Sequence, residues 1–320
     1  MTASREAVVA VSGLRKRFGR SQVLDGLDLT VEKGSVAGFL GPNGAGKSTT
    51  IRVLLGTCRR DAGSVGVLGG DPVRDAVAIH RRIAYVPGDV ALWPQLTGGE
   101  CIDALLALRG ATPRPADRAA MIERFDLDPT KRVATYSKGN RQKVVLVAAL
   151  ASRADLLILD EPTSGLDPLM EDVFGRCVRE AADAGTSVLL SSHILGEVER
   201  LCDTVTIIRS GRTVESGTLT QMRHLTRTRV TAEVVGSTDG LAGLPDVADL
   251  ETTPPTTDTD ATAVTLSVAP AGLSALLVEL GTRGVRSLQI APPSLEELFL
   301  GYYGTDRDTP HRDEPHRDVH

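Results

Sequence analysis

The sequence has no apolar run long enough to cross a membrane. Its longest apolar run, residues 144–151, has eight residues, whereas a membrane-spanning helix needs roughly 20. We therefore expect this chain not to span a bilayer by itself. Residues 1–6 also lack the charged-then-apolar pattern of a secretory signal, which predicts an intracellular protein.

Aromatic residues and positive charge are also scarce. The chain has only ten aromatic residues among 320 and a formal net charge of −5. Ten aromatics are too few for base-stacking platforms, and an acidic chain has no global positive field that attracts nucleic acid. We therefore expect no nucleic-acid partner. Lysine is rarer still, with six lysines against 30 arginines and none after Lys143, which makes Lys47 in a glycine-rich stretch conspicuous.

Cysteine is sparse and carries no metal-binding pattern. The four cysteines lie 25 to 76 residues apart, without the short spacings of metal ligands. This pattern predicts reduced, mostly buried thiols. The cysteines are Cys58, Cys101, Cys177 and Cys202.

The length and residue patterns predict two folded units and a tail. Over residues 1–224, short β-branched runs alternate with helical patterns, which is typical of an α/β fold with a mostly parallel sheet. Apolar runs followed by glycines, acids or serines predict its strands, and a Thr-x-x-Glu capping box at residue 97 predicts a helical stretch to about 125. The predicted strands are 36–40, 82–86, 156–159 and 187–190.

Residues 225–302 predict a small α+β domain. Alternation predicts strands at 228–235, 263–268 and 285–290, and leucines at helical spacing predict a helix over 272–280. A second capping box, Ser294 to Glu297, predicts a short helix to about residue 302. Residues 303–320 repeat Pro-His-Arg-Asp and predict a disordered tail.

Residues 41–48 match the phosphate-loop pattern G-x-x-x-x-G-K-S/T between a predicted strand and a predicted helix. Glycines let the backbone turn so that N–H groups point at phosphate oxygens, and the next helix adds its positive N-terminal end. Lys47 would reach the β- and γ-phosphates, and the Ser48 hydroxyl would bind Mg²⁺. The predicted nucleotide-binding residues are Gly41, Pro42, Asn43, Gly44, Ala45, Gly46, Lys47, Ser48 and Thr49.

The strand at 156–159 leads into two carboxylates, Asp160 and Glu161, 113 residues after Lys47. Asp160 would hold Mg²⁺ opposite Ser48. Glu161 is then placed to polarise or deprotonate the attacking water. Without a phosphate loop, two acids after a strand would more often be a turn.

The order of these motifs resembles the nucleotide-binding subunits of ABC transporters over residues 7–220. Between phosphate loop and acidic strand, Tyr136-Ser-Lys-Gly-Asn140 is similar to that family's Leu-Ser-Gly-Gly-Gln signature, with Ser137 and Gly139 matching. The resemblance implies an ABC-type P-loop domain with a helical subdomain over about 97–152. It also implies that the signature segment acts on ATP held by a second subunit.

Three further roles are implied by the resemblance alone. Asp167 corresponds to an acidic residue that links the two ATP sites across the dimer. His193 corresponds to the switch histidine that contacts the γ-phosphate. Phe18 corresponds to an aromatic residue that stacks on adenine, although an isolated phenylalanine is nearly as often a core residue.

One position departs from the family pattern in a way that affects catalysis. After the strand at 82–86 the family places Gln or Glu, which contacts Mg²⁺ or water, but this chain has Gly88. Asp89 would offer a carboxylate one residue later and is a third candidate metal ligand. The departure puts the hydrolysis rate and the coupling to a partner in doubt, but not ATP binding.

Residues 293–299, Pro-Ser-Leu-Glu-Glu-Leu-Phe, are similar to the ending of ABC-2-type multidrug or antibiotic exporter ATPases. The resemblance implies an ATPase, with ATP and Mg²⁺, that forms a homodimer or heterodimer at the cytoplasmic face of the membrane. Its dimer closure would drive a separate integral membrane permease, which we expect to contact residues 88–105 around an exposed Trp93.

Two alternatives stay open at this level. A soluble ABC-type ATPase acting on ribosomes or DNA is disfavoured by a single phosphate loop and by the absence of sustained heptads between the motifs. A poorly hydrolysing regulatory subunit is suggested by Gly88 and the divergent signature, whereas the presence of Glu161 and His193 argues against it.

Overall fold

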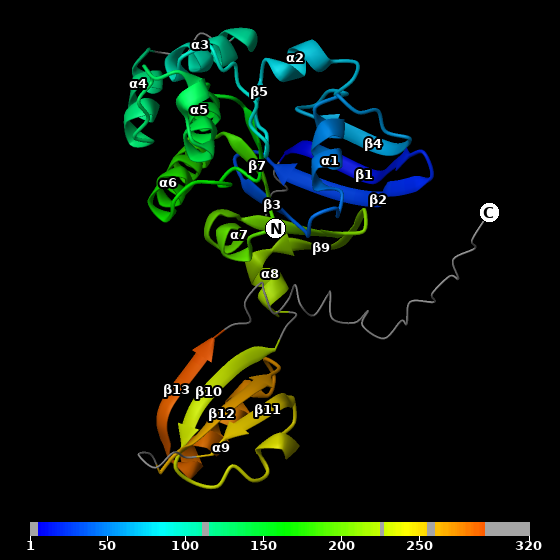
Figure 1. The fold of residues 1–320 in the computed structure, drawn as a ribbon. Helices are drawn as coiled ribbons and strands as arrows, with labels where there is room; N and C mark the ends of the chain where they lie inside the picture. Colours follow the sequence, from blue (N-terminus) through cyan, green and yellow to red (C-terminus); the bar gives the residue numbers. More distant parts are fainter. Residues whose placement is uncertain (1–5, 111–114, 225–226, 255–259, 292–320) are drawn as a thin grey trace, which may run out of the picture. The chain divides into compact units, whose positions relative to one another are not determined.

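The computed structural model describes residues 6–110, 115–224, 227–254 and 260–291. The chain divides into two compact units, Met1–Leu219 and Thr220–His320 (Figure 1). Within the described ranges, no helix is long and apolar enough to cross a membrane. The expected helix after Ser294 and the tail at 303–320 lie outside the described residues.

A six-stranded sheet forms the centre of the first unit. Five of its strands are parallel, and β9 pairs antiparallel with β8 at one edge. Every residue of β3 and β6 is buried, as expected for parallel strands covered on both faces. In spatial order the strands are β5 (Ile83–Val86), β6 (Leu156–Asp160), β7 (Ser187–Ser192), β3 (Val36–Leu40), β8 (Thr204–Arg209) and β9 (Arg212–Thr218).

A second, antiparallel sheet packs beside the first and was not predicted from the sequence. Its spatial order is β2-β1-β4, and its apolar residues share one core with β3, β6 and α1. Figure 1 shows this sheet beside α1, away from the helices α3 to α6. Its strands are β1 (Ala7–Phe18), β2 (Ser21–Glu32) and β4 (Ala62–Val67).

The helical stretch expected over 97–125 is two helices rather than one. The predicted capping box at Thr97 and Glu100 is confirmed, and α3 (Gly98–Leu108) follows it. Gly110 adopts φ +67°, a left-handed conformation that typically ends a helix. A second helix, α4 (Pro115–Arg124), begins after the gap in the described residues.

The remaining helices of this unit connect the strands. Between β6 and β7 runs α6, which begins with a proline and an Asp167 cap. The four cysteines are free and buried, as predicted. The helices are α1 (Lys47–Leu54), α2 (Ala76–His80), η1 (Val133–Thr135), α5 (Lys138–Ala151), α6 (Pro168–Asp183), α7 (Leu195–Leu201) and, across the boundary of the two units, α8 (Leu219–His224).

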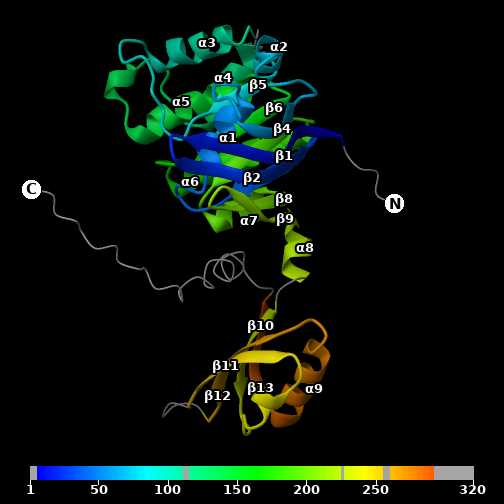
Figure 2. The ribbon, with the colours of Figure 1, turned by 90° about the vertical axis from the view of Figure 1, so that its right-hand side faces the viewer.

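The second unit is a four-stranded antiparallel sheet in the order β11-β12-β10-β13. Alternate residues of β10 and β12 point toward α9 and form a small apolar core with Leu276 and Leu280. Figure 2 shows α9 against one face of the sheet. The elements are β10 (Thr228–Val234), η2 (Leu241–Gly243), β11 (Val247–Thr253), β12 (Thr262–Val268), α9 (Leu273–Arg283) and β13 (Val285–Ala291).

Candidate nucleotide-binding and hydrolysis site

The carboxyl ends of three neighbouring parallel strands carry the predicted motifs. The phosphate loop follows β3, the acidic pair ends β6, and His193 follows β7. Parallel strands end at the same edge of a sheet, where open α/β folds bind their ligands. Motifs up to 152 residues apart in the chain are therefore neighbours in space.

The phosphate loop depends on glycine at its two ends. A Cβ on Gly41 would lie 2.5 Å from the carbonyl oxygen of Ile208, and one on Gly46 would lie 2.6 Å from the side chain of Leu24. Gly46 also has φ +112°, which disfavours any other residue. No side chain caps α1, so its first N–H groups are left for a ligand. The loop therefore fits a phosphate group.

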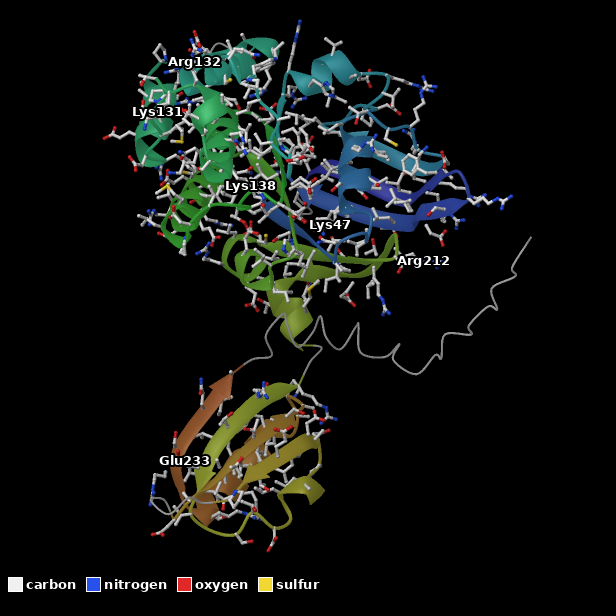
Figure 3. All side chains as sticks on the ribbon, viewed as in Figure 1. Lys47, Lys131, Arg132, Lys138, Arg212 and Glu233 are labelled. Atoms are coloured by element: carbon white, nitrogen blue, oxygen red, sulfur yellow. The ribbon has the colours of Figure 1, made fainter. Side chains whose placement is uncertain are left out.

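Lys47 is the buried cation of this loop. Its side chain is 5% exposed, and its Nζ donates to the carbonyl oxygens of Gly41 at 2.6 Å and Pro42 at 3.2 Å. Burial lowers the pKa of Lys47, whereas the carboxylates of Glu161 and Asp160 raise it. Figure 3 labels the lysine at the start of α1. A phosphate placed here would add a further negative partner for this ammonium group.

Asp160 and Glu161 point in different directions although they are adjacent. Asp160 is buried and accepts a hydrogen bond from the hydroxyl of Ser191 in β7. Glu161 adopts φ +47°, a left-handed conformation that is uncommon for this residue type, and its N–H donates to the Ser191 carbonyl at 3.0 Å. This turn carries the Glu161 carboxylate to within 3.7 Å of Lys47 Nζ.

His193 completes the cluster from the neighbouring strand end. Its Nδ1 lies 3.2 Å from Glu161 Oε1, and its ring is about half exposed. The carboxylate of Glu161 thus lies between an ammonium group and an imidazole, at the sheet edge where the phosphate loop also ends. A carboxylate in this position can accept a proton from a water molecule.

The predicted metal ligands Ser48, Asp160 and Asp89 stay a prediction. Ser48 is exposed in the first turn of α1, and Asp160 ends the neighbouring β6. A hydroxyl and a carboxylate are both oxygen ligands of the kind that Mg²⁺ takes. Gly88 lies close to the acids, since a Cβ on it would lie 3.2 Å from the Asp160 carbonyl oxygen and 3.7 Å from Glu161 Cβ, and Asp89 beside it is exposed. Among the described residues, no three His, Cys, Asp or Glu side chains form a metal-binding group.

The signature segment packs closely against the loop that follows the acidic pair. Ser137 caps α5 by accepting from the Asn140 N–H at 3.2 Å. A Cβ on Gly139 would lie 2.4 Å from the Gly165 carbonyl oxygen. Lys138, labelled in Figure 3, donates to the Ser164 hydroxyl at 2.7 Å. Ser137 is exposed and Gly139 half-buried, so the hydroxyl remains accessible.

Asp167 and Phe18 are both exposed. Asp167 caps α6 by accepting from the Met170 N–H at 3.0 Å, a structural role that its sequence position alone did not reveal. Phe18 ends β1 with 45% of its surface exposed, and Lys16 Nζ lies 5.3 Å from its ring centre. The core alternative for Phe18 is therefore wrong, whereas adenine stacking stays a prediction.

Ser191 is a site residue that the motif analysis missed. Its side chain is fully buried, yet it hydrogen-bonds to Asp160, while its carbonyl accepts from Glu161. A serine pair at the end of the apolar run 188–190 was the available signal.

A large groove opens on the same unit between α1, α2 and β5 on one side and α3 and α5 on the other. Its volume is about 860 Å³, and it is lined mainly by apolar side chains. The strongly exposed Leu108 and the half-exposed Tyr85 belong to its wall. Trp93, 43% exposed, lies one residue beyond the lining residue Leu92.

Comparisons with a family model, with curated proteins and with solved structures all find ATP-binding proteins of ABC transporters or the family itself. The family model described as ABC transporter matches residues 24–164. A daunorubicin resistance ATP-binding protein of Streptomyces coeruleorubidus is 37% identical over 94% of this chain and 98% of its own length. A daunorubicin/doxorubicin resistance ATP-binding protein of Streptomyces peucetius is 35% identical over 94% of both chains. A solved ATP-binding subunit of an ABC transporter is 31% identical over 68% of this chain and 92% of its own, with a TM-score of 0.64.

Proposed function

Because the chain belongs to the ATP-binding proteins of ABC transporters and is an ATPase of that family, we propose that it powers a drug or antibiotic exporter. The observation that carries the hydrolytic part is the convergence of Lys47, Glu161 and His193 at one sheet edge. The exporter subclass is supported by similarity that extends over 98% of a drug-resistance relative, the second unit included.

The proposed hydrolysis uses the residues of this edge in defined roles. Lys47 and the free N–H groups of α1 bind the phosphates, and Glu161 accepts the proton of the water that attacks the γ-phosphorus. The bond from that phosphorus to the β,γ-bridging oxygen breaks, which releases ADP and inorganic phosphate. His193 orients Glu161 and contacts the γ-phosphate. Mg²⁺ held by Ser48 and Asp160 would offset phosphate charge.

We further propose that two ATP-binding subunits complete each other's sites. Ser137 and Asp167 are exposed, and Ser137 stands at the N-terminal end of α5, where backbone N–H groups favour an anion. In a dimer this end would contact ATP held by the phosphate loop of the second subunit. Binding of ATP would then favour the closed dimer, and hydrolysis would release it.

The membrane partner is proposed to be a separate permease that docks in the groove beside Trp93. An apolar groove of this size on a chain surface is typical of a protein-binding site. Its walls include Gly110 and Pro87, so it adjoins both the catalytic edge and the helical subdomain. A partner seated there would follow the closure of the dimer at the cytoplasmic face of the membrane.

Partner capture from detergent-solubilised host membranes tests this proposal. The tagged chain should recover an integral membrane protein with several spans. A Leu92→Glu variant should lose it while keeping ATPase activity, and a Val278→Glu variant should keep it, because Val278 is exposed on α9 outside the groove. Recovery of only soluble partners, or equal recovery by both variants, would contradict the docking model.

A further inference from the structure

A carboxyl group that the motifs do not include is buried directly behind the catalytic edge. Glu197 lies in α7 with only 6% of its surface exposed, between the buried apolar residues of that helix. A buried carboxyl group is costly unless it is hydrogen-bonded. A buried carboxyl group in this helix therefore calls for specific hydrogen-bond partners.

Glu197 holds the loop that carries His193. The Ser192 hydroxyl donates to Glu197 Oε2 at 2.6 Å, and the same hydroxyl accepts from the N–H of Ile194 at 2.9 Å. Ser192 and Ile194 are the two neighbours of His193. Glu197 thus holds the Ser192 hydroxyl, which in turn accepts from the main chain just after His193, whose own ring is half exposed.

Thr163, in the loop that carries Glu161, also influences this carboxyl group. Burial raises the pKa of Glu197, and hydrogen bonds from Ser192 and Thr163 lower it. Thr163 is itself buried and lies two residues after Glu161. Oε1 has no partner of regular hydrogen-bond geometry in the part of the chain that the structure describes. The Ser192 contact is therefore the stronger of the two.

Among the described residues, no cation forms an ion pair with Glu197. Glu171 of α6 raises the pKa of Glu197, and Arg200 of α7 lowers it, both through space. The group consequently acts through its short hydrogen bond to Ser192. A hydrogen bond buried in the protein interior is stronger than the same bond in water, because the interior has a lower dielectric constant.

We propose that Glu197 is a positioning residue that fixes the His193 loop through the hydroxyl of Ser192. By restraining the His193 end of the 3.2 Å contact between His193 Nδ1 and Glu161 Oε1, it keeps the histidine oriented toward the general base. In this role it acts through Ser192 and His193 and not on the nucleotide itself. This inference rests on the proposed catalytic roles of Glu161 and His193, and predicts an effect on turnover rather than on ATP binding.

Steady-state kinetics of matched variants provide the first test. Glu197→Ala should lower kcat at least fivefold with the KM for ATP within twofold of the parent. Glu197→Gln should keep at least half of kcat, since its amide oxygen still accepts from Ser192. Val198→Ala is the control, because this neighbouring side chain is fully buried but packs toward β3 near Gly38. It should lower the melting temperature and keep kcat within twofold. Equal kcat for Glu197→Ala and Val198→Ala would overturn the proposal.

A second measurement does not need turnover. The ring resonances of His193, identified by their loss in His193→Ala, should shift or broaden in Glu197→Ala and stay unchanged in Val198→Ala. Unchanged His193 resonances in Glu197→Ala would refute the positioning role. If His193→Ala and Glu161→Gln both hydrolyse ATP like the parent while this shift is present, the proposed catalytic roles fail and the positioning of His193 by Glu197 stands.

Discussion

Replacing Glu161 with glutamine removes a carboxylate without changing the size of the side chain. Glu161 Oε1 lies 3.7 Å from Lys47 Nζ and 3.2 Å from His193 Nδ1, so both partners lose a negative neighbour. A general base contributes typically 10²- to 10⁴-fold to a rate. We expect kcat to fall roughly 100-fold or more, equivalent to about 2.7 kcal/mol in the activation free energy.

The assay is phosphate release under saturating Mg²⁺–ATP, with ATP affinity measured in parallel. Affinity should persist, because the phosphate loop and its uncapped helix are unchanged. With hydrolysis blocked, the variant should elute as a dimer in ATP and as a monomer without nucleotide. A decrease in kcat of less than tenfold, with the variant folded, would show that Glu161 is not the general base.

Four further outcomes are expected. Lys47→Ala should weaken ATP binding at least tenfold in a titration, and unchanged affinity would exclude the phosphate-loop role. Burial lowers the pKa of Lys47 and the Glu161 carboxylate raises it, so Glu161→Gln should lower the pKa of Lys47 further. Phosphate binding needs the charged ammonium group of Lys47. As the pH rises, the ATP affinity of Glu161→Gln should therefore begin to fall at a lower pH than the affinity of the parent. Gly139→Ala should lower kcat at least tenfold and cost about 1–3 kcal/mol of stability in denaturant unfolding, because its Cβ would meet the Gly165 carbonyl oxygen at 2.4 Å. Gly88→Gln should raise kcat at least twofold, by placing an amide beside Asp160; no change would show that this position does not limit hydrolysis.

The features that could be predicted from the sequence are those formed within one short segment of the chain. The phosphate loop is recognisable because its glycines, lysine and serine are adjacent, and its strand and helix follow from patterns of a few residues. The capping box at Thr97 is confirmed for the same reason, since both of its hydrogen bonds join residues three apart. The strand at 36–40 is confirmed within its predicted bounds. Each of these features depends on interactions within one segment.

The arrangement around those segments required the tertiary structure. The antiparallel β2-β1-β4 sheet was not predicted. Its strands β1 and β2 form a local hairpin with Gly19 and Arg20 as its turn, a signal that the motif analysis overlooked, whereas β4 pairs with β1 across a long connection that no local pattern records. The capping box at Thr97 predicts where the helical stretch begins but not where its first helix ends. That end lies at Gly110, which adopts a left-handed conformation.

The sequence by itself determined the family and the residues of the phosphate loop, because those are properties of short contiguous segments. Only the tertiary structure brought Glu161 between Lys47 and His193, paired Ser191 with Asp160, and showed that Glu197 is buried and holds Ser192 beside His193. The physical reason is that these contacts join separate strand ends of one parallel sheet. Their geometry is set by strand order and by the left-handed turn at Glu161, neither of which a linear pattern specifies.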